Sequence, residues 1–225
     1  MVATILAAAL AIGTSDVQDY FPLAAGSVRT YEEEVVANGK KFTLSVVETV
    51  GSETALKRFE PYTDPDDKEN PQKYRPVEGM GIEVLTSVDG RKGIPTYYEY
   101  RDNRVFIVGV ETGVLMEKVY PIFAIGRNPE QWSYSGEIPV MGAPALATIE
   151  GETRVRKDYR FEGKDYPAVE TTLHTHISFG GDLDADSVQR SVYAKGLGLV
   201  EFEEKGKQGS NTTTRKRKLV KVRNG

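Results

Sequence analysis

The chain has 225 residues, of which 39% are hydrophobic and 28% charged, and its formal net charge is −4. This length fits one β-rich domain with enough apolar side chains for a buried core, and it excludes wholesale disorder. The negative net charge provides no global basic field for nucleic acid or an anionic membrane. The lack of cysteine excludes disulfides, thiolate metal sites and cysteine nucleophiles, and only two histidines are present for His-based catalysis.

The N-terminus carries an apolar, alanine-rich run over residues 5–12, which is too short to span a bilayer. Ala11-Ile12-Gly13 fits the small-x-small pattern of a signal-peptidase site. We therefore predict a signal peptide over residues 1–13 and export to the periplasm or the extracellular space. Residues 1–4 lack the usual basic residue, so a short N-terminal helix packed on the domain is the alternative. No cysteine follows the run, so no lipid anchor is predicted.

A first predicted hairpin joins residues 27–37 to residues 40–50 through Asn38-Gly39, the strongest two-residue turn signal. Pairing across this turn sets Tyr31 opposite Val46, Glu33 opposite Leu44 and Val35 opposite Phe42. The alternate positions are polar and are expected to face water. One apolar and one polar face is typical of an antiparallel sheet covered on one side.

Further hairpins follow along the chain. They are predicted over residues 96–101 and 104–108, where Tyr100 faces Val105 and Tyr98 faces Ile107, over residues 153–161 and 168–179, and over residues 188–204 and 212–223. The charged, proline-containing residues 61–76 are predicted to form a surface loop. No long segment has a helical period, and only residues 143–149 are ambiguous. We predict an all-β fold in one domain, residues 14–225: a single antiparallel curled sheet, half-barrel or sandwich, built from successive hairpins.

Two short motifs carry a resemblance. Tyr20-Phe21-Pro22-Leu23, followed by Gly26 and Tyr31, and the segment Tyr193-Ala194-Lys195-Gly196-Leu197-Gly198-Leu199-Val200 resemble the opening and C-terminal segments of uncharacterised exported bacterial proteins. The resemblance implies export and a curled sheet similar in outline to the half-barrels of periplasmic lipoprotein carriers. It implies no catalytic residues. Gly196 and Gly198 within a strand indicate a bulge, a bend or a close backbone approach. The Tyr-Phe-Pro-Leu opening is expected to seat two large apolar side chains as a plug.

Aromatic residues are the candidates for a ligand lining. The chain has 12 Tyr, 8 Phe and one Trp. The candidates for lining the interior of a curled sheet are Tyr98, Tyr100, Tyr120, Trp132 and Tyr134. Tyrosine is as common in a filled core as in a binding site, so a barrel with no room for a ligand is the alternative.

Two groups of residues have the chemistry of metal ligands. His174 and His176 share one strand face with Glu170, but Thr172 and Ser178 lie there too, and solvated surface histidines are the preferred interpretation. Asp182, Asp184 and Asp186 have the alternating carboxylates of half a calcium loop. Ser187 stands where the turn glycine belongs, and Tyr193 where a closing glutamate belongs. No cofactor is predicted, and weak calcium binding at the three aspartates is the alternative to an acidic connection.

The basic cluster Arg215-Lys216-Arg217-Lys218 lacks interleaved aromatic residues, so we predict a charged edge strand that blocks edge-to-edge pairing, with no nucleic-acid binding. The leading functional hypothesis is a non-enzymatic exported envelope domain that binds a lipid, another apolar ligand or a partner segment. A structural or adhesion-type module that works through its surface loops, with weak calcium binding, is the second hypothesis, and an envelope protein is the alternative partner to an apolar ligand. An envelope hydrolase using scattered carboxylates, of which the sequence distinguishes no pair, is the third. No transmembrane segment is predicted.

Overall fold

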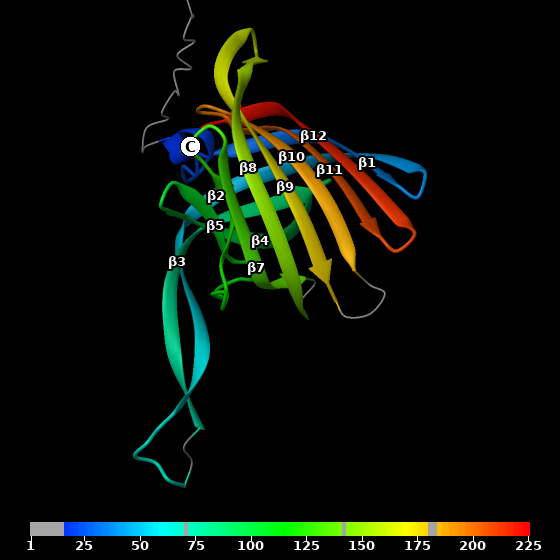
Figure 1. Ribbon diagram of the computed structural model, residues 1–225. Coiled ribbons are helices and arrows are strands. Elements are labelled where there is room, and N and C mark those ends of the chain that lie inside the picture. The colour runs from blue at the N-terminus through cyan, green and yellow to red at the C-terminus, as the bar shows by residue number, and fades with distance from the viewer. Residues whose placement is uncertain (1–15, 70–71, 141–142, 180–183) are drawn as a thin grey trace, which may run out of the picture.

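The computed structural model describes residues 16–69, 72–140, 143–179 and 184–225 (Figure 1). The predicted signal peptide, residues 1–13, lies outside the described residues. The elements in the described ranges are α1 Asp16–Tyr20, β1 Val28–Ala37, β2 Lys40–Thr63, β3 Gln72–Val88, β4 Arg91–Arg101, β5 Arg104–Gly109, β6 Tyr120–Ala124, β7 Glu130–Val140, β8 Ala143–Phe161, β9 Lys164–Ser178, β10 Ala185–Ala194, β11 Gly198–Gln208 and β12 Asn211–Arg223. No helix in these ranges is both long and apolar enough to cross a membrane.

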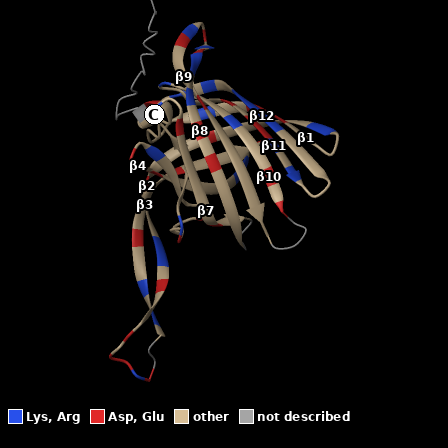
Figure 2. Cartoon of the chain, in the orientation of Figure 1, with Lys and Arg blue, Asp and Glu red and all other residues tan. Residues whose placement is uncertain are grey.

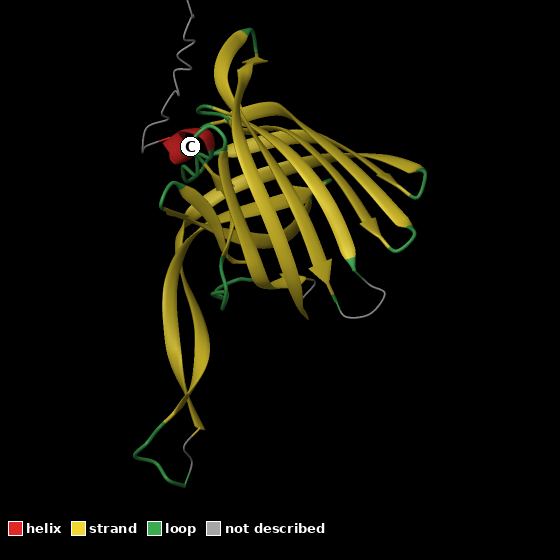
Figure 3. Cartoon of the chain, in the orientation of Figure 1, coloured by secondary structure: helices red, strands yellow, loops and turns green. Residues whose placement is uncertain are grey.

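The strands form one antiparallel sheet that is nearly closed into a barrel (Figure 1, Figure 3). The strand order is β6-β5-β4-β3-β2-β1-β12-β11-β10-β9-β8-β7. The two edge strands approach each other, since the ring centroids of Tyr120 on β6 and Tyr134 on β7 lie 5.7 Å apart. The predicted all-β fold with a single curled antiparallel sheet is therefore confirmed, and its outline is that of a barrel rather than a sandwich.

Tight turns set the register of the hairpins. Both central residues have positive φ in Asn38-Gly39, Asp89-Gly90, Asp102-Asn103 and Glu162-Gly163, as type I′ turns require. The first predicted hairpin is confirmed at every predicted pair, from Tyr31–Val46 to Val35–Phe42. The pairs Tyr100–Val105 and Tyr98–Ile107 are confirmed as well. A two-residue turn leaves one register that keeps the apolar set on a single face, which explains why these pairs were predictable.

Two of the predicted segments differ from the structure. Residues 188–204 are not one strand, because the chain turns at residues 195–197 and separates β10 from β11. Gly196 and Gly198 have φ values of 78° and 86°, so they reverse the chain rather than bend a continuing strand. The predicted loop over residues 61–76 is shorter than expected. Residues 61–63 end β2 and residues 72–76 begin β3, so these two strands form a long two-stranded arm that projects from the barrel (Figure 1).

The N-terminal segment closes one end of the barrel. Val17 and Tyr20 of α1 are 5% and 8% exposed and pack with Val105, Phe123 and Tyr193. The single helix of the described ranges lies at this end, beside the C-terminus (Figure 3). The predicted plug is thus present and consists of Tyr20 together with Phe21, whose ring packs against Tyr98, Phe123 and Tyr193.

Candidate functional site: the interior of the barrel

A cavity of about 260 Å³ lies inside the barrel. Apolar and aromatic side chains form one part of its wall, and Arg29, Glu48 and Arg217 form another. The remaining polar contribution comes from Gln189 and Ser191 of β10. The lining residues are Phe21, Pro22, Leu23, Arg29, Tyr31, Glu48, Val84, Tyr98, Ile107, Ile122, Leu173, Gln189, Ser191, Tyr193, Gly198, Leu199, Phe202 and Arg217.

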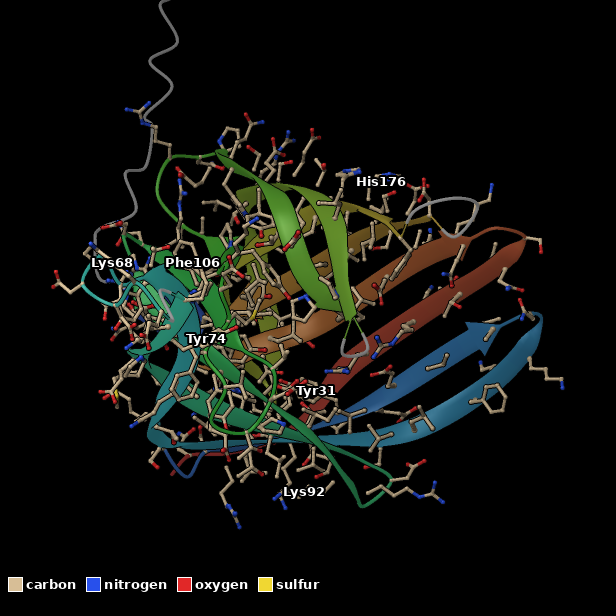
Figure 4. All side chains as sticks on the ribbon, turned by 90° about the horizontal axis from the view of Figure 1, so that it is seen from below. Tyr31, Lys68, Tyr74, Lys92, Phe106 and His176 are labelled. Carbon is tan, nitrogen blue, oxygen red and sulfur yellow. The ribbon has the colours of Figure 1, made fainter. Side chains whose placement is uncertain are left out.

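Strand alternation places the charged residues of the wall. Arg29, Tyr31 and Glu33 are two residues apart on β1, so they share the concave face of the sheet. The cross-strand partner of Arg29 is Glu48 on β2, and that of Glu33 is Arg217 on β12. Tyr31 is seen on the concave side of the sheet in Figure 4.

A buried ion-pair network extends from this wall. Glu33 is 2% exposed and accepts hydrogen bonds from Arg215 Nε at 2.8 Å and Arg217 Nε at 2.6 Å. Arg217 also donates from Nη1 to Glu48 at 3.0 Å, and the Tyr31 hydroxyl donates to the other oxygen of Glu48 at 3.1 Å. The guanidinium of Arg217 lies 5.5 Å from the ring centre of Tyr31, a cation–π distance. Both carboxylates of the network therefore accept hydrogen bonds from arginine or tyrosine side chains, which offsets the cost of taking their charges out of water.

The pKa of Glu33 reflects the balance within this network. Burial by itself would raise the pKa of Glu33, but the hydrogen bonds and charges of Arg215 and Arg217 outweigh burial and lower it below 4.5. Glu33 is therefore ionised at neutral pH. A general acid of a glycosidase needs the opposite shift, which speaks against that role for Glu33.

The tyrosines of the wall are neutral hydrogen-bonding groups. Burial, reinforced by the charge of Glu48, raises the pKa values of Tyr31 and Tyr98 well above 10.0. Burial is also the main cause of the raised pKa of Tyr193. All three phenols therefore stay protonated at physiological pH, and the fixed charges of the wall are those of arginine and glutamate.

Arg29 differs from the other arginines of the interior. It is 6% exposed, and it donates from Nε to the Leu197 carbonyl oxygen at 2.8 Å and from Nη2 to the Pro22 carbonyl oxygen at 2.5 Å. Among the residues that the structure describes, no carboxylate lies within ion-pair distance of Arg29. A buried guanidinium is usually paired with an anion, so Arg29 is the cationic group of the wall best placed to receive one.

The five predicted lining residues have different surroundings. Tyr98 lines the cavity. Tyr100 borders it indirectly, because its hydroxyl donates to the Phe21 carbonyl oxygen at 2.5 Å. Tyr120, Tyr134 and Trp132 pack in a separate cluster with Ala124, Ile138, Ala147, Ile149 and Leu173, where β6 and β7 meet. The structure thus brings one of the five to the cavity wall and places three in the seam that nearly closes the barrel.

The predicted metal ligands that the structure describes lie on the outer surface of the barrel. Asp182 falls outside the described residues. Asp184 accepts a hydrogen bond from Ser178 Oγ at 2.9 Å, and Asp186 Oδ1 is 2.8 Å from His176 Nδ1. His176 lies at the outer surface (Figure 4). In the described part of the chain, no three His, Asp or Glu side chains gather as a metal site. Calcium binding at Asp182, Asp184 and Asp186 stays a prediction.

The basic strand is placed differently from the prediction. β12 is not an edge strand, because it pairs with β1 on one side and with β11 on the other. Arg215 and Arg217 point into the barrel toward Glu33, whereas Lys216 and Lys218 are exposed on the outer face. Successive side chains of residues 215–218 alternate between the two faces of the sheet, so the two arginines neutralise carboxylates inside the barrel and the two lysines do not. The edge strands are β6 and β7, which the barrel seam brings together.

Sequence reasoning missed Arg29, Glu48 and Arg217 as lining residues. One signal was present, because Glu33 falls in phase with Tyr31 and Val35 on the face predicted to be apolar. A carboxylate on a covered face needs a cationic partner, and a strand with alternating arginines was available to supply it. Which arginine meets which carboxylate depends on β12 pairing with β1, a contact between chain segments more than 180 residues apart.

Known proteins offer only distant similarities. No protein-family model and no curated protein matches the chain. A solved structure of a “putative lipoprotein” from Parabacteroides distasonis is similar at 12% identity and a TM-score of 0.45, over 91% of this chain and 98% of that one. A “putative exported protein with YmcC-like fold” from Bacteroides fragilis is similar at 10% identity and a TM-score of 0.40, over the same shares. Both TM-scores lie below 0.5, so neither similarity assigns a ligand or an activity to this chain.

Proposed function

We propose that this chain is a non-enzymatic, exported envelope protein whose barrel binds a small amphipathic molecule. The observation that carries the proposal is the interior cavity of about 260 Å³, where an apolar wall faces Arg29, a buried arginine without a carboxylate partner among the described residues. In the proposed complex the apolar body lies along Phe21, Ile122 and Leu199. Its head accepts hydrogen bonds from Arg29, whose guanidinium has five N–H donors and uses two on backbone carbonyls.

The size of the cavity sets the class of ligand. Sites for drug-sized molecules usually measure about 300–1,000 Å³. A cavity of about 260 Å³ suits a single medium-length chain or a small ring system, and it is too small for a two-chain lipid. The plug formed by Tyr20 and Phe21 closes one end, which favours a bound molecule held inside rather than one passing through.

The first experiment is mass spectrometry of organic extracts from protein purified without detergent. A stoichiometric small amphipathic molecule is the expected result. Decanoate and decanol then serve as defined probes in titration calorimetry, since they share an alkyl chain and differ in the head. We expect decanoate to bind more tightly, and Arg29→Met to remove most of that preference.

A matched pair of variants tests the position of the site. Leu199 lines the cavity, so Leu199→Trp fills it and is expected to weaken decanoate binding by about tenfold or more. Leu146 is 61% exposed on β8, so Leu146→Trp adds the same side chain outside the barrel and serves as the control. Equal binding by both variants, with both folded by circular dichroism, would exclude the interior site.

The proposed location rests on the apolar run at residues 5–12 and the small residues after it. Expression of the full chain with periplasmic fractionation tests it. The expected product is a periplasmic protein whose N-terminal sequence begins at Thr14. Retention of residues 1–13 on a cytoplasmic product would contradict export.

A further inference from the structure

The arm that projects from the barrel has one apolar face. We define the arm as residues 55–63 of β2 and residues 72–80 of β3. Phe59 pairs with Pro76, and Pro61 pairs with Tyr74, so all four side chains share one face of the ribbon. Phe59 is 68% exposed and Tyr74 is 70% exposed. Two aromatic rings and two prolines thus form a surface that nothing in the described chain covers.

The opposite face of the arm carries the charged residues Arg58, Glu60, Lys73 and Arg75, with Tyr62 and Val77 between them. Arg58 is 2.6 Å from Glu60, and Arg75 is 3.5 Å from the other oxygen of the same carboxylate. Lys73 pairs with Asp67 at 2.9 Å. The arm is therefore amphipathic, although a two-stranded ribbon projecting into water gains nothing from keeping one face apolar. Large exposed aromatic groups of this kind usually mark a contact surface.

The tip of the arm is acidic. Residues 64–69 contain Asp64, Asp66, Asp67 and Glu69 against the single cation Lys68. Asp64 and Asp67 also contact Lys73, whereas Asp66 and Glu69 have no ion-pair partner among the described residues. An acidic tip next to an aromatic face opposes docking on an anionic membrane and favours a basic partner surface with an apolar floor.

Such a surface exists at the far end of the same molecule. Around the turns at residues 38–39 and 89–90, the barrel rim carries Lys40, Lys41, Arg91 and Lys92, all exposed. Blue segments mark charged strand ends at this rim in Figure 2. Lys41 pairs with Glu34, and the other three have no ion-pair partner in the described ranges. On the concave face beside them, Phe42 is 50% exposed and Val88 is 36% exposed.

The two complementary surfaces lie at opposite ends of one strand. β2 begins with Lys40 at the rim and ends with Thr63 near the tip of the arm. Its 24 residues would span roughly 80 Å if straight, so the two surfaces are kept apart within one chain. We propose that the arm of one copy docks in the basic rim of a second copy, with Phe59 and Tyr74 against Phe42 and Val88. Such a head-to-tail contact repeats from copy to copy.

Sedimentation velocity of the full chain tests this interaction. From about 1 to about 200 µM protein at about 20 mM salt, we expect reversible growth beyond a dimer, and at about 500 mM salt we expect it to weaken. Phe59→Ser/Tyr74→Ser is expected to leave a folded monomer. Val220→Ser is the control, because Val220 is 48% exposed on the outer face of β12, away from both surfaces.

Charge reversal gives a sharper test. Asp66→Lys/Glu69→Lys makes the tip of the arm basic, and Lys40→Glu/Arg91→Glu/Lys92→Glu makes the rim acidic. Each variant alone is expected to be monomeric, and an equimolar mixture is expected to associate because each arm then faces a rim of opposite charge. A wild-type monomer at all concentrations would overturn the proposal. So would a dimer that does not grow further, or flotation with neutral phosphatidylcholine vesicles that depends on Phe59 and Tyr74 while the protein stays monomeric.

Discussion

Arg29 Nε donates a 2.8 Å hydrogen bond to the carbonyl oxygen of Leu197, a residue 168 positions away in the chain. The same guanidinium donates to Pro22, so it joins the plug segment to the turn between β10 and β11. Lys195 adds an ion pair to Asp19 at 3.0 Å, and the Gly196 amide donates to the Asp19 carbonyl oxygen at 2.7 Å. The N-terminal segment around residues 19–29 and the turn at residues 195–197 therefore contact each other and close one end of the barrel.

Removal of this link is expected to loosen the plug. Arg29→Met keeps the length of the side chain but leaves the Leu197 and Pro22 carbonyl oxygens without their donor. Hydrogen bonds to charged groups contribute about 1.5–3 kcal/mol each. We therefore expect the free energy of unfolding, measured in urea, to fall by roughly 2–3 kcal/mol. Arg127→Met, at an exposed position outside both proposed surfaces, is the control and is expected to change stability by less than about 0.5 kcal/mol. Similar losses in both variants would contradict the structural role of Arg29.

Acidification is expected to weaken the Glu33 network. The pKa of Glu33 is lowered in the folded state, so its contribution is complete above the unfolded value of about 4.5 and is lost as pH falls through the folded pKa. At pH 7, Glu33→Gln leaves Arg217, which is 12% exposed, without its closest carboxylate oxygen. We expect the free energy of unfolding to fall by roughly 2–4 kcal/mol. This is less than for a fully buried ion pair, because Arg215 is 38% exposed.

The measurement is urea unfolding of wild type and Glu33→Gln at pH 7 and near pH 3. The difference in the free energy of unfolding is expected to shrink at the lower pH, because Glu33 of the unfolded wild-type chain is then protonated, whereas the lowered pKa keeps the folded state from gaining the same proton as readily. A difference that stays constant over this range would mean that the charge of Glu33 does not stabilise the fold. Glu32→Gln, on the exposed face of the same strand, is the control.

The seam of the barrel depends on a glycine. A Cβ atom built at Gly151 would overlap the indole of Trp132, its cross-strand neighbour. Gly151→Ala must therefore displace the indole, and we expect the free energy of unfolding to fall by about 1–3 kcal/mol. Because Trp132 is the single tryptophan of the chain, its emission spectrum reports the change directly. Gly163→Ala, where the turn leaves open space around the glycine, is expected to destabilise without altering the emission.

Titration of His176, which pairs with Asp186 on the outer surface, distinguishes a surface ion pair from a metal site. The hydrogen bond with Asp186 raises the pKa of His176 above 6.5. Any stability from this pair is present at low pH and is lost as pH rises through the raised pKa. Nuclear magnetic resonance titration of His176 is expected to show the raised value, and Asp186→Asn is expected to lower it. If millimolar calcium shifted the His176 resonances in wild type but not in Asp184→Ala, the predicted calcium site would be supported instead.

The pairing of neighbouring strands could be predicted from local sequence. Asn38-Gly39, Asp102-Asn103 and Glu162-Gly163 each occupy a two-residue turn between alternating strands, and the side-chain period of two then leaves one register per hairpin. Asp89-Gly90, the turn between β3 and β4, carries the same signal, although we predicted no hairpin there from the sequence. These pairings involve residues close together in the chain, so local sequence carries the information.

The residues that fill the barrel could not be predicted in this way, because they depend on contacts between distant strands. β1 meets β12 across nearly the whole length of the chain, and this pairing converts a basic run into buried partners of Glu33 and Glu48. The same closure places Arg29 between the plug and a distant turn and moves Tyr120, Trp132 and Tyr134 to the seam. Strand alternation tells which face a residue takes, but the partner opposite that face depends on the closure of the sheet, for which the local sequence holds no signal.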